Sequence, residues 1–176
     1  MFKTLLLCAA LSLPCLAQQP QMPDVESQRA AMKKLSFLVG KWAGDARIFP
    51  SSGAPIEMAQ TEEAEYKLDG LVLMIEGVGR NKADGKPTLQ ALGIISYDDE
   101  TATYHMRAYN NGRFLETEVK LADNGHGMSW GFVLGEIKFS SVLRIDDKGD
   151  WSESHDITVG SEPRRKFMEV RVSPQK

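Results

Sequence analysis

Cysteine is nearly missing from this chain. Its 176 residues include only Cys8 and Cys15, and both lie before residue 18. If the first 17 residues are removed as a leader, the remainder has no disulfide, no thiolate nucleophile and no cysteine ligand for a metal. Its stability must then come from the burial of apolar side chains, and its length suits a single domain core.

Runs of positive charge and a second long apolar segment are also missing. The net charge is −3, and the basic residues are scattered along the chain. This distribution argues against nucleic acid or an anionic membrane as a partner. We therefore expect no nucleic-acid partner, and no membrane insertion once the leader is removed.

Motifs that carry catalysis or cofactor binding are the third absence. The chain contains no Gly-x-Ser-x-Gly, no His-Glu-x-x-His and no paired metal ligands. Helical patterns do not alternate with strand patterns, which excludes Rossmann and P-loop chemistry. The sequence therefore favours a protein that is not an enzyme, and we assign no catalytic residues and no metal site. The alternative of an isomerase or hydrolase would need Arg107, Tyr109, Glu153 and His155 to converge within hydrogen-bond reach.

The first residues form an export signal. One positive charge at Lys3 precedes an apolar run from Leu5 to Leu13, which ends before Ala17. The run is too short to span a bilayer, and Pro14 stands where a lipoprotein signal has a small residue before its cysteine. We expect a signal peptide at 1–17, a flexible segment at 18–27, and one domain at 28–174 that is soluble in the periplasm or outside the cell.

The stretch that organises the domain is centred on Trp42. Gly40 and Gly44 lie two residues to either side, so the indole has no side chain beside it on its strand. This arrangement suits a tryptophan that closes one end of a barrel where other backbone comes close. A short helix, capped by Asp24 or Ser27, is expected to cover that end with apolar residues at helical spacing: Met32, Leu35, Leu38 and Val39.

After Trp42 the chain alternates short apolar–polar segments with turn residues. We expect strands at 42–49, 56–68, 71–80, 88–97, 101–109, 113–122, 127–134, 136–145, 151–159 and 165–172. Hairpin connections make the sheet antiparallel, and closure removes its edges. The predicted fold is all-β: a single up-and-down barrel of about ten strands with a short N-terminal helix.

Three patches carry a resemblance to a known family. They are the Leu35–Gly44 stretch, the Gly93–Asp99 turn and the closing Lys166–Arg171 segment, and together they span about residues 30 to 172. The chain resembles an uncharacterised family of secreted bacterial domains with a lipocalin-like (calycin-like) barrel. The resemblance implies a Trp near the start and an Arg in the last strand, here Trp42 and Arg171, and it implies no activity. We expect these two side chains to stack as a cation–π pair that closes the barrel.

A barrel of this size has an interior wide enough for side chains or for one small ligand. Trp130 and Phe132 share one strand face and would line an apolar wall. The sequence therefore predicts a non-catalytic barrel that binds a small, mostly apolar molecule. The alternative is a barrel filled by the same side chains, which acts as a structural or interaction protein through its outer surface.

Polar side chains on two strands are further candidates for ligand binding. His105, Arg107 and Tyr109 share one face of their strand, and Glu153 and His155 share one face of theirs. If both faces point inward, they form a buried polar cluster, which would mark a site. If they point outward, they form a hydrated surface, and the sequence leaves this direction open.

His155 also raises the question of haem. The Gly40-x-Trp42-x-Gly44 opening is similar to that of nitrobindins, which are ferric-haem barrels. This more distant resemblance implies one His on a late strand as the iron ligand, and His155 occupies such a strand. A haem-binding barrel is thus an alternative to our main expectation of no cofactor.

Overall fold

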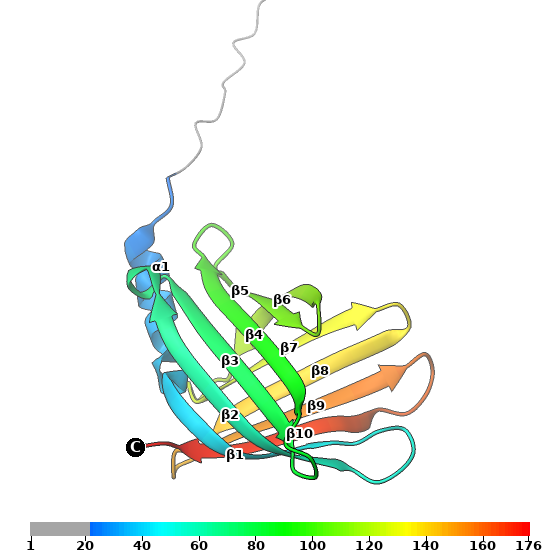
Figure 1. The fold of residues 1–176 in the computed structure, drawn as a ribbon. Coiled ribbons are helices and arrows are strands. Elements are labelled where there is room, and N and C mark those ends of the chain that lie inside the picture. The colour runs from blue at the N-terminus through cyan, green and yellow to red at the C-terminus, as the bar shows by residue number, and fades with distance from the viewer. Residues whose placement is uncertain (1–21) are drawn as a thin grey trace, which may run out of the picture.

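The computed structural model describes residues 22–176 and contains a closed antiparallel barrel (Figure 1). The barrel joins neighbouring strands in chain order, and β1 pairs with β10 to complete the ring. The predicted fold class is therefore confirmed. The elements are α1 (Val25–Met32), the 3₁₀ helices η1 (Lys33–Leu38) and η2 (Leu68–Gly70), β1 (Gly40–Ile48), β2 (Ile56–Lys67), β3 (Val72–Asn81), β4 (Pro87–Asp98), β5 (Thr103–Asn110), β6 (Arg113–Leu121), β7 (Gly127–Leu134), β8 (Ile137–Ile145), β9 (Trp151–Val159) and β10 (Arg165–Pro174).

Strand limits lie within two residues of those expected from the sequence. The agreement arises because the turn residues impose backbone geometry; Asn111 and Gly112, for example, both have positive φ. The predicted signal peptide at 1–17 lies outside the described residues, and so do residues 18–21 of the predicted flexible segment. Residues 25–27 of that segment belong to α1.

The N-terminal segment closes one end of the barrel. Met32, Leu35 and Leu38 are fully buried, as expected, whereas Val39 is 43% exposed. The chain after Met32 is a 3₁₀ helix, in which residues three apart lie on one face. Val39 breaks that spacing and is already extended, so its side chain points to solvent.

Two tyrosines from the barrel donate hydrogen bonds to backbone carbonyls at the C-terminal end of α1. Tyr66 of β2 donates its hydroxyl to the carbonyl of Met32, and Tyr104 of β5 donates to the carbonyl of Ala31, each at 2.7 Å. These carbonyls lie where α1 passes into η1. The helix is thus joined to the inner face of the sheet.

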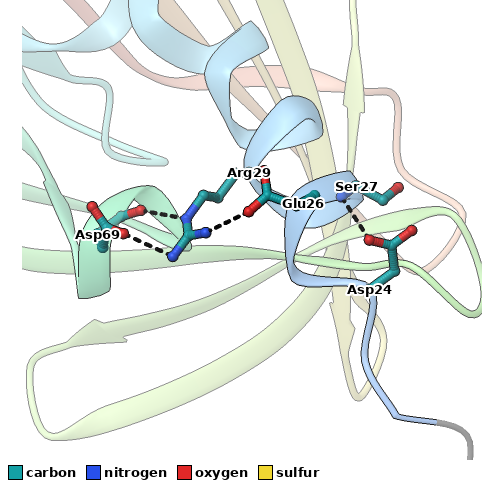
Figure 2. Close-up of polar contacts among 5 residues, drawn as sticks. All are labelled: Asp24, Glu26, Ser27, Arg29 and Asp69. Carbon is teal, nitrogen blue, oxygen red and sulfur yellow. Dashed lines mark hydrogen bonds and ion pairs between the residues drawn. The ribbon is translucent and has the colours of Figure 1, made fainter.

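Polar contacts hold the other end of α1 (Figure 2). Asp24 caps the helix by accepting a hydrogen bond from the backbone N–H of Ser27 at 3.0 Å. Arg29 bonds Glu26 at 2.8 Å and reaches the carboxylate of Asp69 at 2.7 Å in the β2–β3 connection. In Figure 1, α1 accordingly lies at the left end of the barrel, and the β1–β2, β7–β8 and β9–β10 connections lie at the right end.

Trp42 closes the same end from within the barrel, but without Arg171. Its side chain is 6% exposed, donates through Nε1 to the carbonyl of Leu38 at 3.2 Å, and packs edge-to-face on Trp151 at 5.6 Å. Arg171 pairs in register with Asp45 on the outer surface, so the predicted stacking is wrong. Neighbours along a strand point to opposite faces, and Arg171 lies on the outward set.

The burial pattern gives a test of this closure. We call the segment Met32–Leu38, which closes this end of the barrel, the plug. Leu35→Ala is expected to lower the free energy of unfolding by about 2 to 5 kcal/mol, because it leaves a cavity within the plug. Val39→Ala removes an exposed side chain and should change it by about 0.5 kcal/mol or less. Urea unfolding followed by tryptophan fluorescence measures both values. Equal effects of the two substitutions would contradict the plug.

One seam of the barrel is incomplete. β6 and β7 contain nine and eight residues but pair only from Val119 to Leu121 and from Met128 to Trp130. Where this ladder stops, the Thr117 hydroxyl donates to the Gly131 carbonyl at 2.6 Å. Beyond that contact the two strands are not paired, and the inward side chain of Phe132 is partly exposed. The seam between β6 and β7 is thus paired over only part of its length.

Candidate ligand site inside the barrel

The structure places Glu153 and His155 of β9 inside the barrel. Glu153 lies in register between Leu143 and Val170, which are 1% and 2% exposed. The side chains of Glu153 and His155 are 10% and 18% exposed. The direction that the sequence left open is therefore inward for this strand.

The polar side chains of β5 point the other way. Met106 is buried, so its neighbours His105 and Arg107 lie on the outer face, as does Tyr109. Arg107 forms an ion pair there with Glu116. The five-residue interior cluster considered from the sequence is not formed, because β5 and β9 present opposite members of their alternating patterns. A catalytic site that needs these residues to converge is excluded by the same geometry.

His155 lies at the centre of a polar chain. Its Nδ1 is 2.8 Å from the hydroxyl of Ser141, and its Nε2 is 3.0 Å from Oε1 of Glu153. The second contact has ion-pair distance without hydrogen-bond geometry, which leaves Nε2 without a hydrogen-bond partner. Trp151 donates to Oε2 of Glu153 at 3.2 Å, and Trp130 packs edge-to-face on the imidazole at 6.0 Å.

The order Ser141–His155–Glu153 resembles the relay of nucleophilic hydrolases, which sequence reasoning did not find. Such a relay needs free N–H donors for the oxyanion. Here β8 pairs on both sides, Ser141 with Trp130 and with His155, so the ladders use its backbone groups. The geometry favours a hydrogen-bonded support for His155 over a nucleophile.

Two further polar residues inside the barrel, Gln60 and Glu62 of β2, were also missed. They are 1% and 8% exposed, and Gln60 donates through Nε2 to Oε1 of Glu62 at 2.7 Å. Oε1 of Gln60 is buried without a partner. The signal was present in the sequence, because both residues share the inward parity of Met58 and Ala64.

Two glycines of β3 make room for these side chains. A Cβ on Gly77 would lie 2.6 Å from Oε2 of Glu62, and a Cβ on Gly79 would lie 2.6 Å from Oε1 of Gln60. No side-chain carbon fits at either distance. The glycines thus allow two polar side chains to lie flat against the inner wall.

The pKa of Glu62 is raised from its ordinary 4.5 to about 8. Burial is the largest cause, repulsion by the nearby charge of Glu153 adds to it, and the hydrogen bond from Gln60 acts in the opposite direction. Glu62 therefore holds its proton at neutral pH. The barrel interior thus contains two acidic side chains close enough to influence each other.

The rest of the inner wall carries aromatic side chains on one side and small residues on the other. Phe132 and Phe139 stack at 4.5 Å, and Phe167 packs edge-on against Phe139 at 6.2 Å. A Cβ on Gly93 would meet nothing closer than 3.6 Å, so β4 leaves space there. Small inward residues line β3 to β5 across the barrel from the aromatic wall: Gly77, Gly79, Ala91, Gly93 and Ala108.

Haem does not fit this arrangement. An axial imidazole needs one ring nitrogen that faces open space toward the iron. In His155, Nδ1 is bonded to Ser141, and a carboxylate oxygen of Glu153 lies 3.0 Å from Nε2. We therefore derive no function through haem. Within residues 22–176, moreover, His, Asp and Glu side chains form no group of three placed to hold a metal ion.

Two hollows lie on the barrel wall. One, of about 330 Å³, follows β3 to β5 beside Tyr109, and one of about 190 Å³ lies over β8 to β10. Glu153 is among the residues that line the second hollow, and neither hollow is lined by Glu62 or His155.

None of the helical segments in residues 22–176 combines the length and the apolar character that a membrane crossing needs.

The geometry defines a class of protein: a closed ten-stranded antiparallel barrel with a polar group inside. Among solved structures, the chain is similar to Rv2717c from M. tuberculosis, with a TM-score of 0.63 and 16% sequence identity over 83% of this chain and 98% of that one. At this identity the similarity shows the fold alone. No family model and no curated protein matches the chain. The resemblances to the secreted bacterial family and to nitrobindins therefore stay predictions.

Proposed function

We propose that the protein is a non-catalytic barrel that binds a small molecule, with a mostly apolar body, in its interior. The observation that carries this proposal is the partly exposed pair of Glu153 and His155 inside a barrel whose core is mostly apolar. A barrel that only fills itself gains most by burying apolar side chains there. Polar groups in such a place are typical of binding sites, where a few of them orient a ligand.

The β6–β7 seam is the entrance in this proposal. Phe132 lies beyond the last paired residues of the seam and stacks on Phe139. An apolar ligand that enters here would lie against these rings, opposite the small residues of β3 to β5. Trp130 pairs with Val119 in the seam and packs on His155, so it connects the entrance to the polar pair of Glu153 and His155. This pair would then contact the end of the ligand that enters first.

Export belongs to the same proposal and rests on the signal-like leader at residues 1–17. A secreted or periplasmic barrel would meet small apolar molecules outside the cytoplasm and hold them away from water. Amino-terminal sequencing of the protein purified from a periplasmic fraction tests this part. A chain that starts at Met1 and remains in the cytoplasm would contradict it.

Phe132 and its neighbour Val133 form a matched pair for the binding test. Phe132→Ala is expected to weaken the binding of diphenylhexatriene, a neutral apolar probe, about tenfold, because it removes the aromatic wall. Val133 is 65% exposed on the outer face, so Val133→Ala should leave the affinity unchanged. Fluorescence titration measures both. No saturable binding, or equal losses in the two variants, would refute an interior site.

A further inference from the structure

We propose that the interior polar group binds the protonated amine of an amphipathic ligand; this inference rests on the proposed function and names its ligand class. The group consists of Gln60, Glu62, Glu153 and His155. An alkyl- or arylammonium head would contact the carboxylates and the free amide oxygen, and the apolar body would lie against Phe132.

The first argument is an excess of acceptors. Glu62 and Glu153 both point inside, and the Gln60 amide oxygen is buried without a partner. Gln60 is 1% exposed, and a buried polar atom without a partner is unfavourable. A ligand rich in N–H donors would satisfy the free oxygen.

The second argument is the absence of a basic partner. In the described part of the chain, neither Glu62 nor Glu153 forms an ion pair with Lys or Arg, and only His155 approaches Glu153. The charge that acts on Glu62 is that of Glu153, which has the same sign. Ionisation of Glu62 beside Glu153 is therefore unfavourable in the free protein, and a cation bound between the two side chains would favour it.

The third argument is that the chain preserves room for these acceptors. A Cβ on Gly77 would collide with Glu62, and a Cβ on Gly79 would collide with Gln60, so the two glycines leave space for these side chains. The aromatic ring of Trp130 borders His155, and aromatic faces attract ammonium groups. An ammonium carries three N–H donors, which matches one amide oxygen and two carboxylates.

Proton linkage follows from this arrangement. Burial holds Glu62 neutral in the free protein, whereas a bound ammonium favours its ionised form. Binding of an amine near neutral pH should therefore release a proton from Glu62. An uncharged ligand of the same shape should release none.

The test compares phenethylamine with phenethyl alcohol, which share a body and differ in the head. Isothermal titration at about pH 7.5 is expected to give an affinity for the amine about tenfold or more above that for the alcohol. Glu62→Gln and Glu153→Gln should each reduce this preference severalfold. Glu63→Gln is the matched control, because Glu63 is the next residue of β2 and pairs with Lys41 on the outer face. Titration in two buffers of different ionisation enthalpy should show the proton release in the wild type and its loss in Glu62→Gln.

The outcomes separate the two proposals. Equal affinities for amine and alcohol in the wild type would overturn the ammonium site and leave the apolar site standing. A preference that persists in both Glu62→Gln and Glu153→Gln, with both variants folded by circular dichroism, would also overturn it. If neither compound binds and Phe132→Ala changes nothing with the apolar probe, both proposals fail.

Discussion

Gly44→Ala is expected to destabilise the barrel by on the order of 3 kcal/mol or more. A Cβ at this position would lie 2.3 Å from the carbonyl oxygen of Arg171 and 2.9 Å from the Cα of Val172. Both atoms belong to the backbone of β10, so no side-chain rotation relieves the collision. β1 and β10 would have to separate at the seam that closes the ring, and a domain of marginal stability tolerates little of that.

Gly93→Ala is the matched control for this substitution. Gly93 also faces inward from a strand, but the nearest atom to its added Cβ would be Sδ of Met106 at 3.6 Å, an ordinary contact. Its effect should lie within about 1 kcal/mol of zero, because alanine also suits a strand slightly better than glycine. Urea unfolding followed by tryptophan fluorescence reports both variants. A Gly44→Ala protein as stable as Gly93→Ala would show that β1 and β10 are not in close backbone contact.

Glu62→Gln is expected to stabilise the ligand-free protein at and above neutral pH. The folded state raises the pKa of Glu62 from 4.5 to about 8, so the native protein retains a proton that the unfolded chain loses. The stability associated with this proton is fully present below about pH 4.5 and is lost as the pH rises toward about 8. Above that pH the loss is on the order of 3 to 5 kcal/mol, and a neutral glutamine avoids it.

The measurement is the free energy of unfolding across this pH range. The wild type should lose stability relative to Glu62→Gln between about pH 5 and pH 8, and the two curves should converge at the acid end. Glu63→Gln, which changes an exposed partner of Lys41, should follow the wild-type curve within about 1 kcal/mol. Parallel curves for Glu62→Gln and the wild type would mean that Glu62 ionises freely.

The second prediction concerns a feature that a barrel built for stability alone would lack. Inside the barrel the chain keeps the carboxyl group of Glu62 and the unpartnered amide oxygen of Gln60, with Gly77 and Gly79 facing them from β3. Apolar side chains packed in the same place would be more stable. Local departures from good packing of this kind are concentrated at functional sites. The ammonium proposal gives the departure a reason, because the same groups that destabilise the free protein would bind a cation.

Much of the fold could be predicted from local chemistry. Turn residues such as Asn111-Gly112 adopt the positive φ that hairpins need, and they set the strand limits. Gly44, two residues after Trp42, indicates close backbone approach, and β10 lies there. The register places Glu62 on the apolar face of β2, so even this buried acid could be read from parity.

The candidate site could be predicted only in part. The alternating pattern divides the residues of each strand between two faces, but it does not say which face points into the barrel. His105 and Arg107 on β5 have the same spacing as Glu153 and His155 on β9, yet the first pair faces water and the second faces the interior. The role of Ser141 depends on β8 lying beside β9, which no local pattern encodes.

What the sequence by itself determined is the set of short alternating strands, their turns and the plug that begins at Met32, because these depend on neighbours along the chain. The tertiary structure decided which face of each strand is the inside, where the β6–β7 ladder stops, and which distant side chains meet around His155. The physical reason is that closure of the ring selects one face of all ten strands together. That choice depends on packing and register across the barrel, which no single segment contains.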